Sequence, residues 1–368
     1  MSATPSQARP ASARGTARST TPTSCARAPE RTRGAAKGRG MKRLALLLLA
    51  AAWLVPPAAV SAQAADKTYR IGFVAPAGAA SPEARRALQG LTRALAARGY
   101  SPGKDLIVVS RFDDGRPERL PALIKELLDS RVDVLVTRSY PAARDAKAAT
   151  TTVPIVMSGG GDPVETGLAP SLSRPGGNLT GISDISAVLS AKRLELLKSA
   201  VPGLKRVAML WNADDLGMTM RYKAAADAAA KLGIAVQPLG VREPDDFAAA
   251  FAAMEHDKPD GIMMVTDVLT LLNHKRVFEF AATHRIPAIY EVEGLVRDGG
   301  LMSYGPDGKE VTAGVADLVA RILKGAKPAD LPFEEPTRFR FVINKKTADA
   351  LGLTLPPAVL ERADEVIE

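Results

Sequence analysis

The sequence predicts an α/β protein with two similar doubly wound parallel-sheet lobes joined by three crossovers. From residue 65 onward, short apolar runs rich in β-branched residues alternate with longer amphipathic stretches rich in alanine and leucine. This alternation is typical of βαβ units and parallel sheets. The same order of strands and helices occurs again in the second half of the chain. A chain of 368 residues is also longer than one hydrophobic core usually serves.

The first copy of the pattern covers residues 69–157. Its expected helices place leucine, isoleucine and alanine on one face, and polar residues, glycine or proline separate them from the strands. Gly99 ends the first helix, because glycine is common just past a helix end. The expected strands are 69–74, 106–110, 132–137 and 155–157, and the expected helices are 83–98, 117–130 and 142–150.

The second copy covers residues 206–290, and parts of it align with the first. Residues 69–74 match 205–210, and residues 132–136 match 259–263. The expected strands are 206–210, 235–239, 261–266 and 288–290, and the expected helices are 218–231, 245–255 and 271–284.

The remaining chain is explained best if it crosses back between the lobes. A strand is expected at 301–304, a helix at 310–324, a strand at 336–343, and a short helix ending near 351–352. We expect crossovers near 181–186, 303–307 and 334–338, where Gly181, Gly305 and Pro336 lie in short turns. Lobe I then holds residues 66–182 and 305–335, and lobe II holds residues 183–304 and 336–368.

The beginning of the chain predicts export. Within residues 41–64, Lys42 and Arg43 precede twelve apolar residues, and Ala62-Gln63-Ala64 follows. This order is typical of a Sec-type signal peptide and predicts a periplasmic protein. Twelve helical residues span about 18 Å, short of the roughly 30 Å hydrocarbon core, although an uncleaved anchor is the alternative. Residues 1–40 are an irregular leader, interpreted as lying outside the natural product, with translation starting at Met41.

Charge and cysteine content argue against several classes of protein. Residues 1–65 hold ten Lys and Arg and one Glu, which accounts for the whole net charge of +9. The body therefore has no excess positive charge to drive nucleic-acid binding. The single cysteine of the whole chain, Cys25, also lies within residues 1–65, so the body contains none. No disulfide or cysteine-based zinc site is possible in the body.

No pattern typical of catalysis, a metal site or a cofactor site is found. His256, His274 and His284 share no helix face, and no G-x-S-x-G motif occurs. Residues 158–163 contain three consecutive glycines but lack the lysine of a phosphate-binding loop. Two interpretations of this segment stay open: a flexible turn, or a cradle of backbone N–H groups beside a ligand.

Polar side chains at or after the ends of expected strands are the candidate ligand-binding residues. Ligands bind beyond the carboxyl ends of parallel strands, and two facing lobes form a cleft there. Arg138 could pair with a ligand carboxylate. For each residue, helix capping or turn formation is the alternative. The candidates are Pro76, Thr137, Arg138, Ser139, Ser158, Gly159, Asp162, Asn212, Thr266, Asp267, Tyr290 and Glu291.

Several segments resemble the substrate-binding proteins of ABC transporters with the type I periplasmic-binding fold. The most specific is the run S-L-x-R-P-G-G-N-x-T-G at residues 171–181. Supporting segments are 148–156, 162–164, 167–168, 192–198, 299–305, 322–328, 342–353 and 362–367, so the resemblance covers almost all of residues 69–368.

The resemblance implies a secreted receptor that closes like a hinge around one small solute and docks on an ABC permease in the membrane. An amino-acid-like polar ligand is favoured, and we expect a monomer without enzymatic activity, cofactor or nucleic-acid partner. Three alternative functions stay open: a ligand sensor for a signalling receptor, a secreted enzyme, and an effector-controlled DNA regulator.

Overall fold

The computed structural model describes residues 67–183 and 185–368. The expected leader at 1–40, the expected signal peptide at 41–64 and Cys25 lie outside these residues. Within the described ranges, no helix has both the length and the apolar character needed to span a lipid bilayer.

Lobe I is built on a five-stranded parallel sheet with the order β2-β1-β3-β4-β5. In this sheet, Ile71 of the central strand lies opposite Val108 on one side and Val134 on the other. Its strands are β1 (Tyr69–Ala75), β2 (Leu106–Phe112), β3 (Val134–Thr137), β4 (Ile155–Ser158) and β5 (Leu179–Ile182). Its helical segments are α1 (Pro82–Ala96), η1 (Pro117–Arg119), α2 (Leu120–Asp129), α3 (Tyr140–Ala149), α10 (Gly308–Leu323) and η2 (Pro328–Asp330).

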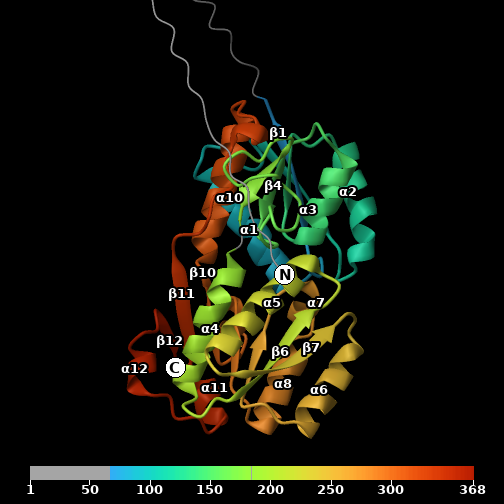
Figure 1. The fold of residues 1–368 in the computed structure, drawn as a ribbon. Helices are drawn as coiled ribbons and strands as arrows, with labels where there is room; N and C mark the ends of the chain where they lie inside the picture. Colours follow the sequence, from blue (N-terminus) through green and yellow to red (C-terminus); the bar gives the residue numbers. More distant parts are fainter. Residues whose placement is uncertain (1–66, 184) are drawn as a thin grey trace, which may run out of the picture. The chain divides into compact units, whose positions relative to one another are not determined.

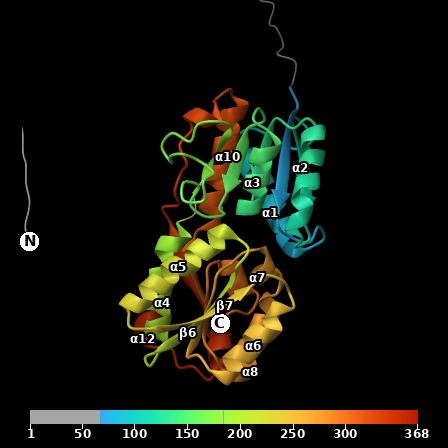
Figure 2. The same ribbon diagram turned by 45° about the vertical axis from the view of Figure 1, so that its right-hand side comes forward.

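Lobe II is built on a seven-stranded sheet with the order β12-β11-β10-β9-β8-β6-β7, and helices pack against it (Figure 2). Its strands are β6 (Arg206–Asn212), β7 (Ala235–Val241), β8 (Gly261–Met264), β9 (Ala288–Tyr290), β10 (Met302–Pro306), β11 (Phe339–Asn344) and β12 (Glu365–Ile367). Its helices are α4 (Ser186–Ala200), α5 (Leu216–Lys231), α6 (Asp246–His256), α7 (Val268–Leu272), α8 (His274–His284), α9 (Glu293–Arg297), α11 (Lys345–Ala350) and α12 (Pro357–Leu360).

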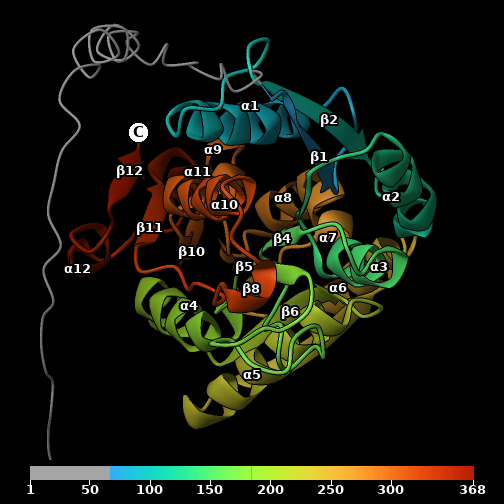
Figure 3. The ribbon, with the colours of Figure 1, turned by 90° about the horizontal axis from the view of Figure 1, so that it is seen from above.

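The chain passes between the lobes three times. It leaves lobe I after β5, returns between β10 and α10, and enters lobe II again before β11 (Figure 1). Helix α10 lies beside α1 in lobe I (Figure 3). The first and third passages run side by side, because Ser183 N–H donates to the Glu334 carbonyl at 2.7 Å and Glu334 N–H donates to the Gly181 carbonyl at 3.0 Å.

Each lobe has its own hydrophobic core. Two clusters lie in lobe I, one including Ile71 and Val319 and the other including Ile124 and Leu135. The lobe II clusters include Met209 and Phe247. Since no cluster formed by the described residues mixes the two lobes, a hinge motion can change the contact between the lobes without opening either core.

The predicted fold class is confirmed, with differences in detail. The expected helix at 271–284 is instead two helices, because Asp267 caps α7 and the chain turns at Asn273 before α8 begins. Strand β11 pairs antiparallel with β10, since the chain enters lobe II in the direction opposite to that in which β10 leaves it. Strands β5 and β12 were not expected as strands, and each has only three or four residues.

The close packing of β10 against the end of β9 generates a stability prediction. A Cβ at Gly305 would overlap the carbonyl oxygen of Glu291. Gly305→Ala is therefore expected to lower the free energy of unfolding by about 1–3 kcal/mol in chemical denaturation. Gly308→Ala is the control, because nothing lies within 4 Å of its new methyl group and alanine favours the start of α10. Equal stability of the two variants would contradict this account of Gly305.

Candidate ligand-binding site

A cavity of about 630 Å³ lies between the two lobes and is lined by residues of both. Lobe I contributes residues at the carboxyl ends of β1, β3 and β4, and lobe II contributes residues that follow β6, β8 and β9. The passages between the lobes form a further wall, with Pro306 and Pro336. This is the place where parallel sheets bind ligands, and the volume suits a small solute.

Arg138 is the notable charge on the lobe I side of the cavity. Its backbone N–H donates to the Val74 carbonyl at 3.1 Å, which fixes the residue just beyond β3. In the part of the chain that the structure describes, its guanidinium has neither an ion-pair partner nor a hydrogen bond. Arg138 remains exposed to solvent in the open cavity, and partial desolvation by the surrounding protein lowers its pKa below the usual arginine value. A cation in this position favours a ligand anion.

Two carboxylates face the cavity from lobe II, and both begin helices. Asp215 caps α5 by accepting the Met218 N–H at 3.2 Å. Asp267 caps α7 by accepting the Thr270 N–H at 2.9 Å, and the Asn212 side-chain amide donates to its other oxygen at 2.6 Å. Burial, reinforced by the charge of Asp267, raises the pKa of Asp215 to about 6. Burial also raises the pKa of Asp267.

Glu291 lies at the floor of the cavity, where its carboxylate accepts hydrogen bonds from other groups of the protein. Arg193 Nη1 donates to Oε1 at 2.8 Å, and Arg221 Nη1 donates to Oε2 at 2.8 Å. The Thr266 N–H donates to Oε2 at 3.0 Å. Arg193 also donates to the Tyr304 carbonyl at 2.7 Å, in the strand that leads to lobe I. This network therefore ties the cavity floor to the second passage between the lobes.

Most of the remaining wall is apolar. These side chains leave room for the uncharged part of a ligand. Besides Arg138 and the two aspartates, the charged lining residues are Glu83, Arg86, Arg221, Glu291, Glu293, Arg297 and Asp298. The apolar lining residues are Phe73, Leu91, Val136, Met218, Val268, Leu271, Val292, Leu295, Val311 and Val315.

Eight of the twelve candidate residues line the cavity: Pro76, Arg138, Ser139, Ser158, Gly159, Thr266, Asp267 and Glu291. The other four do not. Thr137 is fully buried, and Tyr290 is buried with its ring against Phe278. Asp162 accepts the N–H groups of Val164 and Glu165 in a turn, and Asn212 acts through Asp267. The ligand-binding role of all twelve residues remains a prediction.

Sequence reasoning missed several residues of the cavity. Asp215 follows β6 and precedes a helix, so its capping position at a strand end was the available signal. Glu83 and Arg86 come from the first turns of α1, and Val311 and Val315 come from α10. These four follow no strand end, and the sequence alone carries no signal that brings them together.

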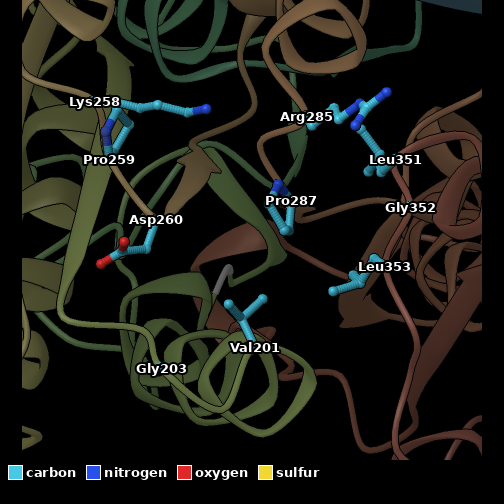
Figure 4. Close-up of a pocket in the computed structure, with 10 residues that line it drawn as sticks. All are labelled: Val201, Gly203, Lys258, Pro259, Asp260, Arg285, Pro287, Leu351, Gly352 and Leu353. Atoms are coloured by element: carbon cyan, nitrogen blue, oxygen red, sulfur yellow. The ribbon is translucent and has the colours of Figure 1, made fainter.

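A second hollow, of about 450 Å³, lies on lobe II at the amino ends of β6, β8 and β9. Figure 4 shows Lys258, Asp260 and Arg285 around it. The Asp260 carboxylate accepts the N–H groups of Lys205 and Arg206, so it is used in holding the chain at the start of β6. Because ligands bind at the other end of parallel strands, the cavity between the lobes is the stronger candidate.

Comparisons with known proteins agree with this geometry. Residues 79–367 match the family model described as ABC transporter substrate binding protein. The tyrosine-binding protein of Clostridioides difficile is 27% identical over 272 residues, which are 74% of this chain and 78% of that protein.

Two solved structures are similar over 82% of this chain and the whole of each matched chain. A conserved domain protein from Vibrio cholerae is 29% identical, with a TM-score of 0.77. An ABC domain from Streptococcus pneumonia, solved in complex with L-Trp, is 27% identical, with a TM-score of 0.76.

The Glu291 network is expected to dominate the stability of lobe II. Glu291→Gln removes the negative charge that Arg193 and Arg221 face in a buried site, and should lower the free energy of unfolding by on the order of 3 kcal/mol. The matched control is Glu126→Gln, which breaks an exposed ion pair with Arg111 and should cost less than about 1 kcal/mol. Urea denaturation of both variants measures the difference, and similar losses would refute the buried network as a support.

Asp215 should make stability depend on pH. Its pKa of about 6 in the folded protein lies above the value of about 3.9 expected in the unfolded chain. The stability linked to its protonation is present below about pH 4 and is lost as pH rises through about 6. Asp215→Asn keeps a capping oxygen but cannot ionise, so from pH 4 to pH 8 it should gain on the order of 2–3 kcal/mol relative to wild type.

Denaturation curves at several pH values test this expectation. The charged groups acting on Asp215 are Asp267, which raises its pKa, and Arg144, which lowers it. If the free energy of unfolding changes with pH in the same way for the wild type and Asp215→Asn, the prediction is wrong.

Proposed function

Because the chain belongs to the ABC transporter substrate-binding protein family, whose model matches residues 79–367, we propose that it is the solute receptor of an ABC importer. The resemblance expected from the sequence is confirmed. Members of this family bind small-molecule solutes, work with ABC permeases outside the cytoplasm, and are not enzymes. The proposal for this chain is import of a free amino acid with an apolar or aromatic side chain.

One observation carries the ligand class. A cation on lobe I, Arg138, and two carboxylates on lobe II, Asp215 and Asp267, line a single cavity whose other walls are mostly apolar. An amino acid carries a carboxylate and an ammonium group on one carbon atom. In the proposed complex, Arg138 pairs with the carboxylate and the aspartates accept the ammonium group. The apolar residues then enclose the side chain.

Two relatives support this ligand class. The protein from Clostridioides difficile is named for tyrosine binding, and the structure from Streptococcus pneumonia holds L-Trp. Both ligands combine an amino-acid backbone with a large ring, which matches charged groups beside an apolar wall. The binding of either compound by this chain is part of the proposal.

Binding and closure are coupled in the proposed mechanism. A ligand that touches Arg138 and the two aspartates together interacts with both lobes only when they are closed. It therefore stabilises the closed form by the difference between its affinities for the closed and open forms. The permease then recognises the closed receptor. The apolar walls exclude water, which strengthens the charge pairs at both ends of the ligand backbone.

The cellular setting follows from the same proposal. Residues 41–64 direct export through the Sec system, and the mature receptor acts in the periplasm as a monomer. A signalling role would use the same ligand-dependent closure, so uptake of labelled amino acid by cells with and without the gene separates transport from sensing.

Arg138→Met is expected to weaken L-tryptophan binding in calorimetry by about 10- to 150-fold. The substitution removes a charge-assisted hydrogen bond that contributes about 1.5–3 kcal/mol to the binding free energy. L-tryptophan amide lacks the carboxylate and should bind the wild type weakly. The variant should no longer distinguish the acid from the amide.

Arg174→Met is the control, since Arg174 is exposed and lies outside the cavity. If Arg138→Met still binds L-tryptophan much more tightly than L-tryptophan amide, a residue other than Arg138 binds the ligand carboxylate. If no amino acid binds the wild type in calorimetry, the proposed ligand class fails as a whole.

A further inference from the structure

Beside the ligand cavity, the two lobes touch at a place where neither side has a side chain. Gly160 and Gly161 lie in the loop after β4 of lobe I, and Gly217 lies in the first turn of α5 in lobe II. A Cβ at Gly161 would lie 3.3 Å from the Cα of Gly217, and a Cβ at Gly217 would lie 2.8 Å from the carbonyl oxygen of Gly160. The contact is therefore made backbone to backbone.

The closest restriction on position 217 comes from the opposite lobe. Gly217 is the second residue of a helix and does not have a left-handed backbone, so the backbone of α5 does not itself require glycine there. Within lobe II, a Cβ would lie 3.2 Å from Oδ1 of the capping residue Asp215. Alanine would favour the helix, because glycine has a lower helix propensity. The atom that would crowd this Cβ most closely, at 2.8 Å, is the Gly160 carbonyl oxygen across the cleft.

The lobe I side of this contact has little freedom to yield. Gly160 has φ +108°, and a Cβ there would lie 2.5 Å from the backbone nitrogen of Tyr140 at the start of α3. Its neighbour Gly159 donates its N–H to the Ile182 carbonyl at 3.3 Å. The glycine loop is thus packed against lobe I, and its carbonyl forms a firm surface toward α5.

Two other contacts between the lobes are made by side chains that can rotate away. Arg86 Nη2 of α1 lies 4.0 Å from Asp298 Oδ2 beyond α9, and both residues are exposed. Leu272 of α7 lies against the turn at Gly115 and is half exposed. Because these side chains have free space around them, they do not fix the distance between the lobes as the backbone contact does.

We propose that Gly217 and Gly160 form a glycine latch, a contact that sets how far the lobes close and therefore how tightly the receptor holds its ligand. The inference rests on the proposed receptor function but concerns residues that need not touch the ligand. It predicts that a side chain at position 217 will weaken binding while leaving both lobes folded. The open form lacks the contact with Gly160, so the substitution should act mainly on closure, and cross-linking without ligand separates this effect from any shift of the nearby Asp215 side chain.

The first experiment measures closure without any ligand. In a Cys25→Ser background, Arg86→Cys and Asp298→Cys place two thiols across the cleft, and a short bismaleimide joins them only when the lobes approach. Gly217→Ala is expected to slow this cross-linking by about tenfold, and Gly217→Leu by more, because the closed population falls. Gly203→Ala, in open space on lobe II, and Lys223→Leu, on the exposed side of α5, are the matched controls.

The second experiment measures affinity and folding in the same variants without the added cysteines. The Kd for L-tryptophan or L-tyrosine should rise in the same order as the cross-linking rate falls, since binding requires the closed form. The melting temperature without ligand should stay unchanged or rise for Gly217→Ala, which separates a closure defect from a folding defect.

The outcomes separate the latch from the receptor proposal. Equal cross-linking rates in the wild type and both position-217 variants overturn the latch, even if amino acids bind. Failure of the wild type to cross-link also overturns it, because the lobes would not approach as the structure has them. Slow cross-linking of Gly217→Leu together with no binding of any amino acid by the wild type supports the latch and overturns the proposed ligand class.

Discussion

One buried carboxylate, that of Glu291, connects the parts of lobe II on which the cavity depends. It accepts hydrogen bonds from Arg193 of α4, from Arg221 of α5 and from the backbone beyond β8. Arg193 continues the network to the Tyr304 carbonyl in the strand that leads back to lobe I. Breaking a buried charge network is costly, so these elements keep one arrangement. The cavity floor and the second passage between the lobes therefore move as one body.

This arrangement leaves different charges free on the two lobes. The Glu291 carboxylate is engaged by protein groups, whereas Asp215 and Asp267 face the cavity with raised pKa values. Arg138 faces them from lobe I with a lowered pKa. All three shifts have burial as their main cause, and a ligand of opposite charge at each end would offset that cost. Because Arg138 and the two aspartates lie on different lobes, a ligand that pairs with all three holds the lobes together.

Much of this could be predicted from the sequence, and the exceptions have a common cause. The alternation of strands and helices and its repetition predicted the two lobes. The rule that ligands bind beyond the carboxyl ends of parallel strands led to Arg138 and Asp267, which both line the cavity. The rule failed at Tyr290 and Thr137, because successive side chains of a strand point to opposite faces and the sequence does not show which face meets the cleft. Gly217 was beyond prediction, since its helical backbone does not require glycine. The atom that would crowd its Cβ most closely, the Gly160 carbonyl oxygen, lies in the opposite lobe.

The energetics of closure follow from where the apolar surface is buried. Each lobe keeps its own hydrophobic clusters, so opening the cleft exposes neither core. Among the described residues, the contacts outside the cavity include a backbone approach, one long ion pair between exposed residues and one leucine on a turn. An exposed ion pair contributes little to stability. The lobes therefore gain little by closing alone, and the free energy for closure is left to the ligand. A receptor built in this way reports the presence of its solute, because the solute adds contacts that shift the population from the open toward the closed form.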